Sequence, residues 1–269
     1  MWRARQLALW VLAASAIPEA AIAQTRPGGT QLEARGAQIR LAQPERMPGR
    51  VVISLSAGVQ AAATGFSDRF GFERNVETAS VEVQYGQQPA ILFDGGIGIR
   101  LWKNLGAGIA VSHSTGDDSA DIDARIPHPF FFERFRTVTG SQSGITRTET
   151  AAHMQLQYSF NATPSVTLVL SAGPSWLNVA QELVTDVEYD ETFPYDEATF
   201  RSAPARRSTA SATGFNAGAE LRWMFARHVG AGGFARFTRA TVDLETHDNR
   251  RIAVRGGGVH AGVGLRVAF

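Results

Sequence analysis

GVHAGVGLRVAF (residues 258–269) ends the chain, and in it apolar residues alternate with small or polar ones. One parity holds Val259, Ala261, Val263, Leu265, Val267 and Phe269, and the other holds Gly258, His260, Gly262, Gly264, Arg266 and Ala268. A period of two is typical of a β-strand with one apolar face, because successive side chains point to opposite faces. The sequence therefore predicts a C-terminal strand with an aromatic residue at its end.

The same alternation recurs in seven segments further upstream. They span residues 51–59, 91–101, 105–111, 152–160, 166–176, 215–225 and 229–237. These segments predict an all-β protein of about eight antiparallel strands, each about 10 residues long, a length that suits a tilted crossing of a membrane. Residues 76–86 and 130–139 could form an extra pair or lengthen existing strands, so about ten strands remain possible.

The connections between these segments alternate in length along the chain. Those at 103–104, 161–165 and 226–228 are short, whereas those at about 63–89, 116–147, 180–212 and 245–251 are longer. An antiparallel barrel with an even number of strands has its short turns and both termini at one end. The sequence therefore predicts a closed barrel over residues 50–269, with short turns at one end and longer loops at the other.

The start of the chain has the pattern of a cleaved export signal. Arg3 and Arg5 precede an apolar run over residues 7–17, and Ala21-Ile22-Ala23 supplies small residues where a signal peptidase cleaves. The run is too short for a transmembrane helix, which needs roughly 20 residues. We expect a signal peptide at residues 1–23. Residues 24–49, rich in Gly, Pro, Gln and charge, are expected to form a flexible periplasmic tail.

Composition argues against several kinds of site. The chain has no cysteine, which excludes disulfides and thiolate metal ligands. Without residues 1–23 the acidic and basic residues balance, which leaves no electrostatic case for binding nucleic acid. The histidines are scattered over different segments, and the glycine pairs lie inside predicted strands rather than before a helix. We therefore expect no metal site and no cofactor.

Charged residues within the predicted strands fall on the parity opposite to the apolar ones. They are Asp94, Arg100, Glu220, Arg222, Arg236 and Arg266, and His153 and His260 share their parity. A charge that faces lipid at the midplane costs about 2–4 kcal/mol, so the charged parity is expected to face the lumen. A barrel of this size has an interior that its own side chains fill. We expect a salt-bridged plug, with a narrow solute or ion pathway as the alternative.

On this pattern, residues 50–269 resemble the OmpA-type eight-stranded transmembrane barrels of bacterial outer membranes. The final strand, with Val263, Leu265, Val267 and Phe269, resembles the C-terminal signature that the outer-membrane assembly machinery recognises. The resemblance implies a Gram-negative outer-membrane location, both termini in the periplasm, and contact with outer-membrane lipids and lipopolysaccharide. The architectural alternative is a lipocalin-like secreted barrel, whose apolar face points inward.

The expected role is structural or interactive at the cell surface, and no catalysis is expected. The aromatic run at residues 130–132 lies beside Arg134 and Arg136 in a predicted external loop, where it could contact lipopolysaccharide or a partner, or pack on the barrel rim. Two alternatives remain open. One is a small-solute channel, and the other is a lipid A-modifying enzyme that uses His113 and its flanking serines.

Overall fold

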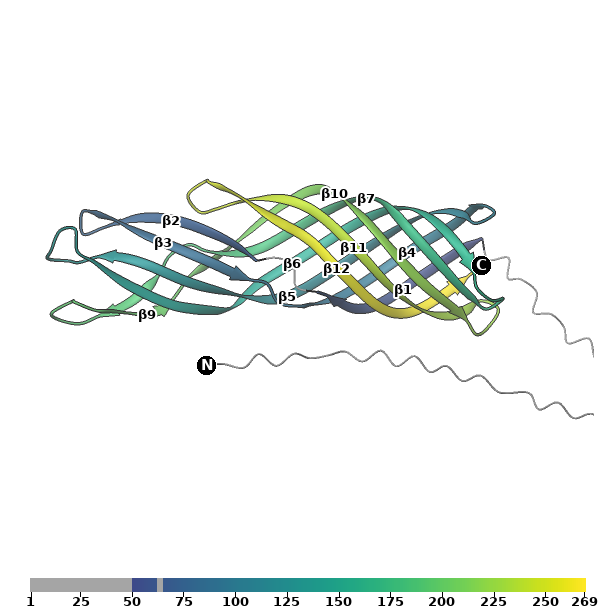
Figure 1. Cartoon of the computed structure of the whole chain (residues 1–269), viewed down its shortest axis with the longest axis horizontal. Helices are drawn as coiled ribbons and strands as arrows, with labels where there is room; N and C mark the ends of the chain where they lie inside the picture. The colour runs from purple at the N-terminus through teal and green to yellow at the C-terminus, as the bar shows by residue number, and fades with distance from the viewer. Residues whose placement is uncertain (1–49, 62–64) are drawn as a thin grey trace, which may run out of the picture. The chain divides into compact units, whose positions relative to one another are not determined.

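The computed structural model describes residues 50–61 and 65–269, and eight of their strands form a ring. The ring strands are β1 (Val51–Gln60), β4 (Ala90–Trp102), β5 (Leu105–Pro127), β6 (Phe135–Asn161), β7 (Val166–Val184), β10 (Ala205–Met224), β11 (Val229–Glu245) and β12 (Arg251–Ala268). Each pairs antiparallel with the next in this order, and β12 pairs with β1 to close the ring (Figure 1). The predicted all-β, closed antiparallel barrel with eight strands in its ring is confirmed.

Four further strands in the described residues lie outside the ring. The strands β2 (Phe66–Arg74) and β3 (Glu77–Gly86) form a hairpin, and β3 also pairs with residues 119–125 of β5. The strands β8 (Glu188–Glu191) and β9 (Ala198–Ser202) form a separate hairpin. The ambiguous residues 76–86 therefore extend the sheet without widening the ring, and residues 135–139 belong to β6.

The predicted signal peptide at 1–23 and the predicted tail at 24–49 lie outside the described residues. The described chain begins with Arg50, directly before β1. In this part of the chain, no helix is long and apolar enough to span a membrane.

Most of the residues predicted to lie in long loops are strand residues, so that prediction is wrong. The predicted loop at 116–147 contains the ends of β5 and β6, which have 23 and 27 residues, and only residues 128–134 connect them. The predicted loops at 63–89 and 180–212 contain the two hairpins and further strand ends. Most ring strands are therefore much longer than the predicted length of about 10 residues.

A reversal of polarity along single strands explains this error. On β5 the outward side chain is apolar at Ile109 but charged at Asp123. The inward side chain changes in the opposite sense, from Ser112 to Ile122. The period of two continues through the whole strand, but its apolar face moves from outside to inside. A sequence analysis that looks for one continuous apolar face therefore ends the strand at the point of reversal and assigns the rest to a loop.

We call the half of the barrel next to the three short turns the girdle section. It comprises β1, β4 and residues 105–113, 150–161, 166–177, 213–224, 229–239 and 259–268. Many of its outward apolar residues are more than half exposed, including Leu55, Phe93, Ile109, Met154, Leu156, Trp176, Leu221, Val263 and Leu265. A continuous apolar surface of this kind is unfavourable in water and compatible with lipid.

We call the other half, including β2, β3, β8 and β9, the extension. Its interior is an apolar core that includes Val81, Val83, Ile122, Ile126, Val138, Ile145, Leu183, Val242, Leu244 and Val254. The hydroxyl of Tyr85 lies in this core and accepts a hydrogen bond from the backbone N–H of Val184 at 2.7 Å, and burial raises the pKa of Tyr85 above its ordinary value. The extension is thus packed like the interior of a soluble protein.

Both ends of the described chain lie at the short-turn end of the girdle section. The N–H of Val51 donates to the carbonyl of Phe269 at 3.2 Å, and the N–H of Phe269 donates back at 2.9 Å. Lys103 adopts a left-handed conformation, with φ of 47°, in the turn that it forms with Asn104. Figure 1 shows the C-terminus at this end, whereas β2, β3 and β9 lie at the opposite end.

Candidate functional site

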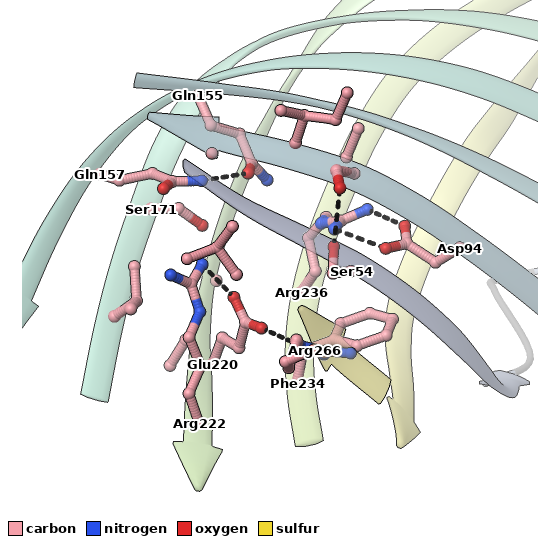
Figure 2. Close-up of a pocket in the computed structure, with 18 of the residues that line it drawn as sticks. Ser54, Asp94, Gln155, Gln157, Ser171, Glu220, Arg222, Phe234, Arg236 and Arg266 are labelled. Atoms are coloured by element: carbon pink, nitrogen blue, oxygen red, sulfur yellow. Dashed lines mark hydrogen bonds and ion pairs between the residues drawn. The ribbon is translucent and has the colours of Figure 1, made fainter. Parts of the chain in front are cut away.

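The lumen of the girdle section holds a charged layer centred on Glu220 of β10. Its Oε2 accepts a hydrogen bond from Arg222 Nη2 at 2.7 Å, and its Oε1 accepts one from Arg266 Nε (Figure 2). Arg266 is only 1% exposed, and its Nη1 also donates to Ser56 Oγ at 2.9 Å. Two guanidinium groups share one carboxylate, so this layer carries a net positive charge.

A second layer is a balanced ion pair between strands that are not neighbours in the ring. Arg236 of β11 donates to the two carboxylate oxygens of Asp94 on β4, at 2.6 and 3.3 Å (Figure 2). Both residues are buried, and the guanidinium lies 5.1 Å from the ring centre of Phe234. A bidentate arginine–carboxylate pair fixes both distance and orientation, so it ties together two parts of the lumen wall that β1 and β12 separate in the ring.

A third layer is a chain of uncharged hydrogen bonds around His153 of β6. Its Nε2 lies 3.0 Å from Ser112 Oγ, its Nδ1 lies 2.8 Å from Ser175 Oγ, and Asn216 donates to the same Ser175 oxygen at 2.8 Å. His260 lies in the lumen as well, and neither of its buried ring nitrogens has a hydrogen-bond partner. This layer connects β5, β6, β7 and β10 through side chains.

Buried charges also cap the girdle section where the lumen meets the apolar core of the extension. Arg147 pairs with Glu149, and both are buried. Glu149 accepts the N–H of Gly257 at 2.8 Å, and Arg147 donates to the carbonyl of Arg255 at 3.0 Å. The pairing of β12 with β1 ends at His260 and Gln60. Beyond this point Arg147 and Glu149 provide hydrogen bonds to backbone groups of β12 that β1 does not reach.

Little empty space remains between the charged layers. The cavity bounded by Asp94, Glu220, Arg236 and Arg266 has a volume of about 30 Å³. A buried water needs about 10–15 Å³ of such space, so this cavity has room for about two or three waters and for no larger solute. The geometry is that of a side-chain plug.

The structure brings five of the six predicted lumen charges together, namely Asp94, Glu220, Arg222, Arg236 and Arg266. Arg100 is exposed at the end of β4 and lines a separate cavity at the short-turn end. Sequence reasoning missed Arg147 and Glu149, because Arg147 lies at the end of the predicted loop at 116–147 and Glu149 lies between that loop and the predicted strand at 152–160. Parity along an unbroken β6 would have placed them inward with His153.

The C-terminal residues of the predicted assembly signal lie mostly on the outer surface of the girdle section. Val263, Leu265 and Phe269 are exposed, and Val267 is half-buried. His113 also points outward, and its ring nitrogens lie 2.9 Å from Thr150 Oγ1 and 3.4 Å from Thr115 Oγ1. Over the described residues, no group of three His, Cys, Asp or Glu side chains is arranged to hold a metal ion.

At the far end of the extension, two turns form an exposed aromatic group that we call the distal aromatic cluster. It consists of Phe130, Phe131, Phe132, Phe193 and Tyr195. The exposed fraction reaches 73% at Phe132 and 81% at Phe193. The rings of Phe130 and Tyr195 are 5.6 Å apart, so the two turns contact each other through the cluster.

Buried polar side chains hold the distal aromatic cluster in place. Arg136 is 4% exposed and donates to Glu191 Oε2 at 2.5 Å, to the Tyr195 carbonyl at 3.1 Å and to the Pro127 carbonyl at 3.0 Å. The buried His128 ring accepts the N–H of Phe130 at 3.1 Å. The backbone that bears the exposed rings is therefore fixed by buried hydrogen bonds.

The comparisons with known proteins find solved structures that are similar to this one, and they find no match by sequence. No protein-family model and no curated protein matches the chain. The chain is similar to the outer membrane protein OprG from Pseudomonas aeruginosa (8% identity, 82% of this chain and 96% of that one, TM-score 0.47). It is also similar to Neisserial surface protein A (13% identity, 81% of this chain and 96% of that one, TM-score 0.41). A third similar structure is the outer membrane protease OmpT from Escherichia coli (8% identity, 81% of this chain and 96% of that one, TM-score 0.44). The fold assignment rests on the strand pairing described above.

The ion pair between Asp94 and Arg236 leads to a stability prediction. The change Asp94→Asn leaves a buried guanidinium without its counter-charge, so the free energy of unfolding should fall by about 3–5 kcal/mol. Urea unfolding of the refolded protein in lipid vesicles, followed by tryptophan fluorescence, measures the change. The matched control is Glu82→Gln, which breaks a more exposed pair with Arg69 and should change the free energy of unfolding much less, because water and salt screen an exposed pair. Equal effects of the two variants would contradict a structural role of the lumen pair.

Proposed function

We propose that the protein is an integral outer-membrane barrel, closed to solutes, that carries a surface-interaction site on its extension. The observation that carries this proposal is the reversal of polarity between the two sections. In the girdle section apolar side chains point outward and charges inward, and in the extension the order is opposite. The first arrangement suits lipid around a polar lumen, and the second suits water around an apolar core.

The membrane location is supported by the outer surface of the girdle section. Aromatic side chains gather at its short-turn end, at Trp102, Tyr158, Phe160, Trp223, Phe225 and Phe269, as expected where a barrel meets the membrane interface. In this proposal the apolar surface contacts outer-membrane lipids and lipopolysaccharide. The outward residues of β12 are the part that the assembly machinery would recognise, and both termini face the periplasm.

The packed lumen favours a closed barrel over the alternative of a small-solute channel. One ion-pair layer joins β4 to β11 and the other joins β10 to β12, and the space between them is about 30 Å³. A solute would have to break a buried pair such as Asp94 with Arg236 to pass, and breaking such a pair costs about 3–5 kcal/mol.

The surface interaction is assigned to the distal aromatic cluster, and we propose that it contacts a protein outside the cell. Residues 114–127 of β5 continue beyond the girdle section, which at about 3.3 Å per residue and a tilt of about 40° is a rise of roughly 35 Å. This height removes the cluster from the barrel's own membrane. Exposed aromatic rings next to arginine have the composition of protein–protein hot spots, and the fixed base at Arg136 lowers the entropic cost of binding.

The proposed role is not catalytic. The lipid A-modifying alternative relies on His113, whose ring nitrogens face two threonine hydroxyl groups. A nucleophile–base–carboxylate arrangement would need a carboxylate that orients the imidazole. His113 contacts one hydroxyl group on the neighbouring strand and one on its own strand, and these contacts are adequate for holding β5 and β6 in register.

A closed lumen predicts the absence of steady conductance. The refolded wild-type protein, inserted in a planar lipid bilayer, should give no stable single-channel current under a salt gradient or an applied voltage. A general porin inserted under the same conditions serves as the positive control. A stable current of uniform size would favour the channel alternative and contradict closure.

The proposed orientation predicts where an engineered thiol reacts. The chain has no cysteine, so single replacements give an unambiguous label. On intact cells a membrane-impermeant maleimide should label Phe132→Cys in the distal aromatic cluster. The control Arg227→Cys, in a short turn, should react only after the outer membrane is permeabilised. The reverse pattern would contradict the orientation, and recovery of the protein in the soluble periplasmic fraction would contradict the membrane location.

The distal aromatic cluster can be tested with a peptide library on phage, selected against refolded protein immobilised through its short-turn end. Selected peptides should lose binding at least tenfold, about 1.4 kcal/mol, to the double variant Phe131→Ser with Phe193→Ser. The matched control is Val76→Ser, which removes another highly exposed apolar side chain from a different turn. Dissociation constants from biolayer interferometry give the readout. Peptides that bind the double variant as well as the wild type would refute the assignment.

A further inference from the structure

The lumen opens at the short-turn end into a cavity of about 370 Å³. It lies outside the charged layer of Glu220 and is lined by residues of seven ring strands, all except β11, and of two short turns. Pockets for small ligands have volumes of about 300–1,000 Å³, so this cavity has room for a small molecule. The space beyond it, between the charged layers, is about 30 Å³, so a ligand that enters meets a closed end.

The charged side chains that line this cavity all carry the same sign. They are Arg50, Arg100, Lys103 and Arg222, and no carboxylate side chain is among the described residues of the lining. Glu220, the acidic partner of Arg222, already accepts a second hydrogen bond from Arg266. Arg222 and Arg266 thus bind the same carboxylate, and the buried Nε of Arg222 has no hydrogen-bond partner. Such an excess of positive charge in a concave, protein-walled space attracts anions.

We propose that this cavity is a binding site for an anion of the phosphate class. Guanidinium groups match the geometry of phosphate oxygens and bind them with charge-assisted hydrogen bonds, and an ammonium such as that of Lys103 adds a point charge. The side chains of Asn104 and Ser159 also line the cavity and provide uncharged donors. The ligand balances the surplus charge of the Glu220 layer. In the orientation proposed above, the ligand enters the cavity from the periplasm. The site itself is formed by the barrel and does not depend on that orientation.

Pyrophosphate is a suitable probe, because its two phosphate groups can reach cations on different walls of the cavity. Isothermal titration of the full-length refolded protein in a zwitterionic detergent should show saturable binding of one pyrophosphate. Binding should weaken as ionic strength rises, since salt screens exposed charges. Removal of one cation by Arg100→Gln or Lys103→Gln should raise the dissociation constant about tenfold, because each variant deletes one charge-assisted contact to the bound anion.

The control variant is Arg227→Gln, which removes a cation from a neighbouring short turn outside the cavity lining. It should leave the dissociation constant unchanged, and its fold is checked by heat-modifiable migration on detergent gels together with the other variants. Absence of saturable binding by folded wild-type protein would overturn the proposal. Equal weakening by Arg227→Gln and by the lining variants would also overturn it, because it would show attraction to net charge rather than a site.

The phosphate group could belong to a soluble anion or to a lipid headgroup, and one further titration separates these sources. Short-chain phosphatidylglycerol is added to the micelles before pyrophosphate. Displacement of pyrophosphate by the lipid identifies a headgroup as the ligand, and undiminished pyrophosphate binding identifies a soluble anion. Both results support the site. Neither bears on the distal aromatic cluster, so failure here leaves the proposed surface interaction unaffected.

Discussion

Closure of the eight-stranded ring is the constraint on which the other features depend. Because β12 pairs with both β11 and β1, the backbone N–H and C=O groups of the girdle section are satisfied inside the ring. Closure also gives every strand an inside and an outside, and the period of two then assigns each side chain to one of them. The apolar surface, the charged lumen and the core of the extension all follow from this division between two environments.

The same strands meet opposite demands along their length. In the proposed membrane location the outward side chains of the girdle section must suit lipid, and the lumen takes polar groups that have to be paired because they are buried. Asp94 with Arg236 and Glu220 with two arginines meet this need. The same proposal puts the extension in water, which suits its inward apolar side chains and their core. The buried pair of Arg147 and Glu149 stands at the junction, where the polar lumen gives way to apolar packing.

The two proposed sites lie at opposite ends and depend on different physics. The distal aromatic cluster exposes apolar rings to water, which is unfavourable unless a partner covers them, and Arg136 keeps them ordered. The cavity at the short-turn end is lined by four basic side chains and, among the described residues of its lining, by no carboxylate side chain. The closed lumen lies between them, so each site is accessible from one side of the membrane in the proposed orientation.

The sequence by itself determined the fold class, the short turns, the ring of eight strands and the parity of Asp94, Glu220, Arg222, Arg236 and Arg266, because alternation at period two is a local property. It failed on the extension, since the apolar face of a strand such as β5 changes sides between Ile109 and Ile122. Only the tertiary structure decided which charges pair across the lumen and that two separate turns build one aromatic cluster. Those contacts join residues far apart in the chain, and ring closure and strand stagger, which no local pattern encodes, bring them together.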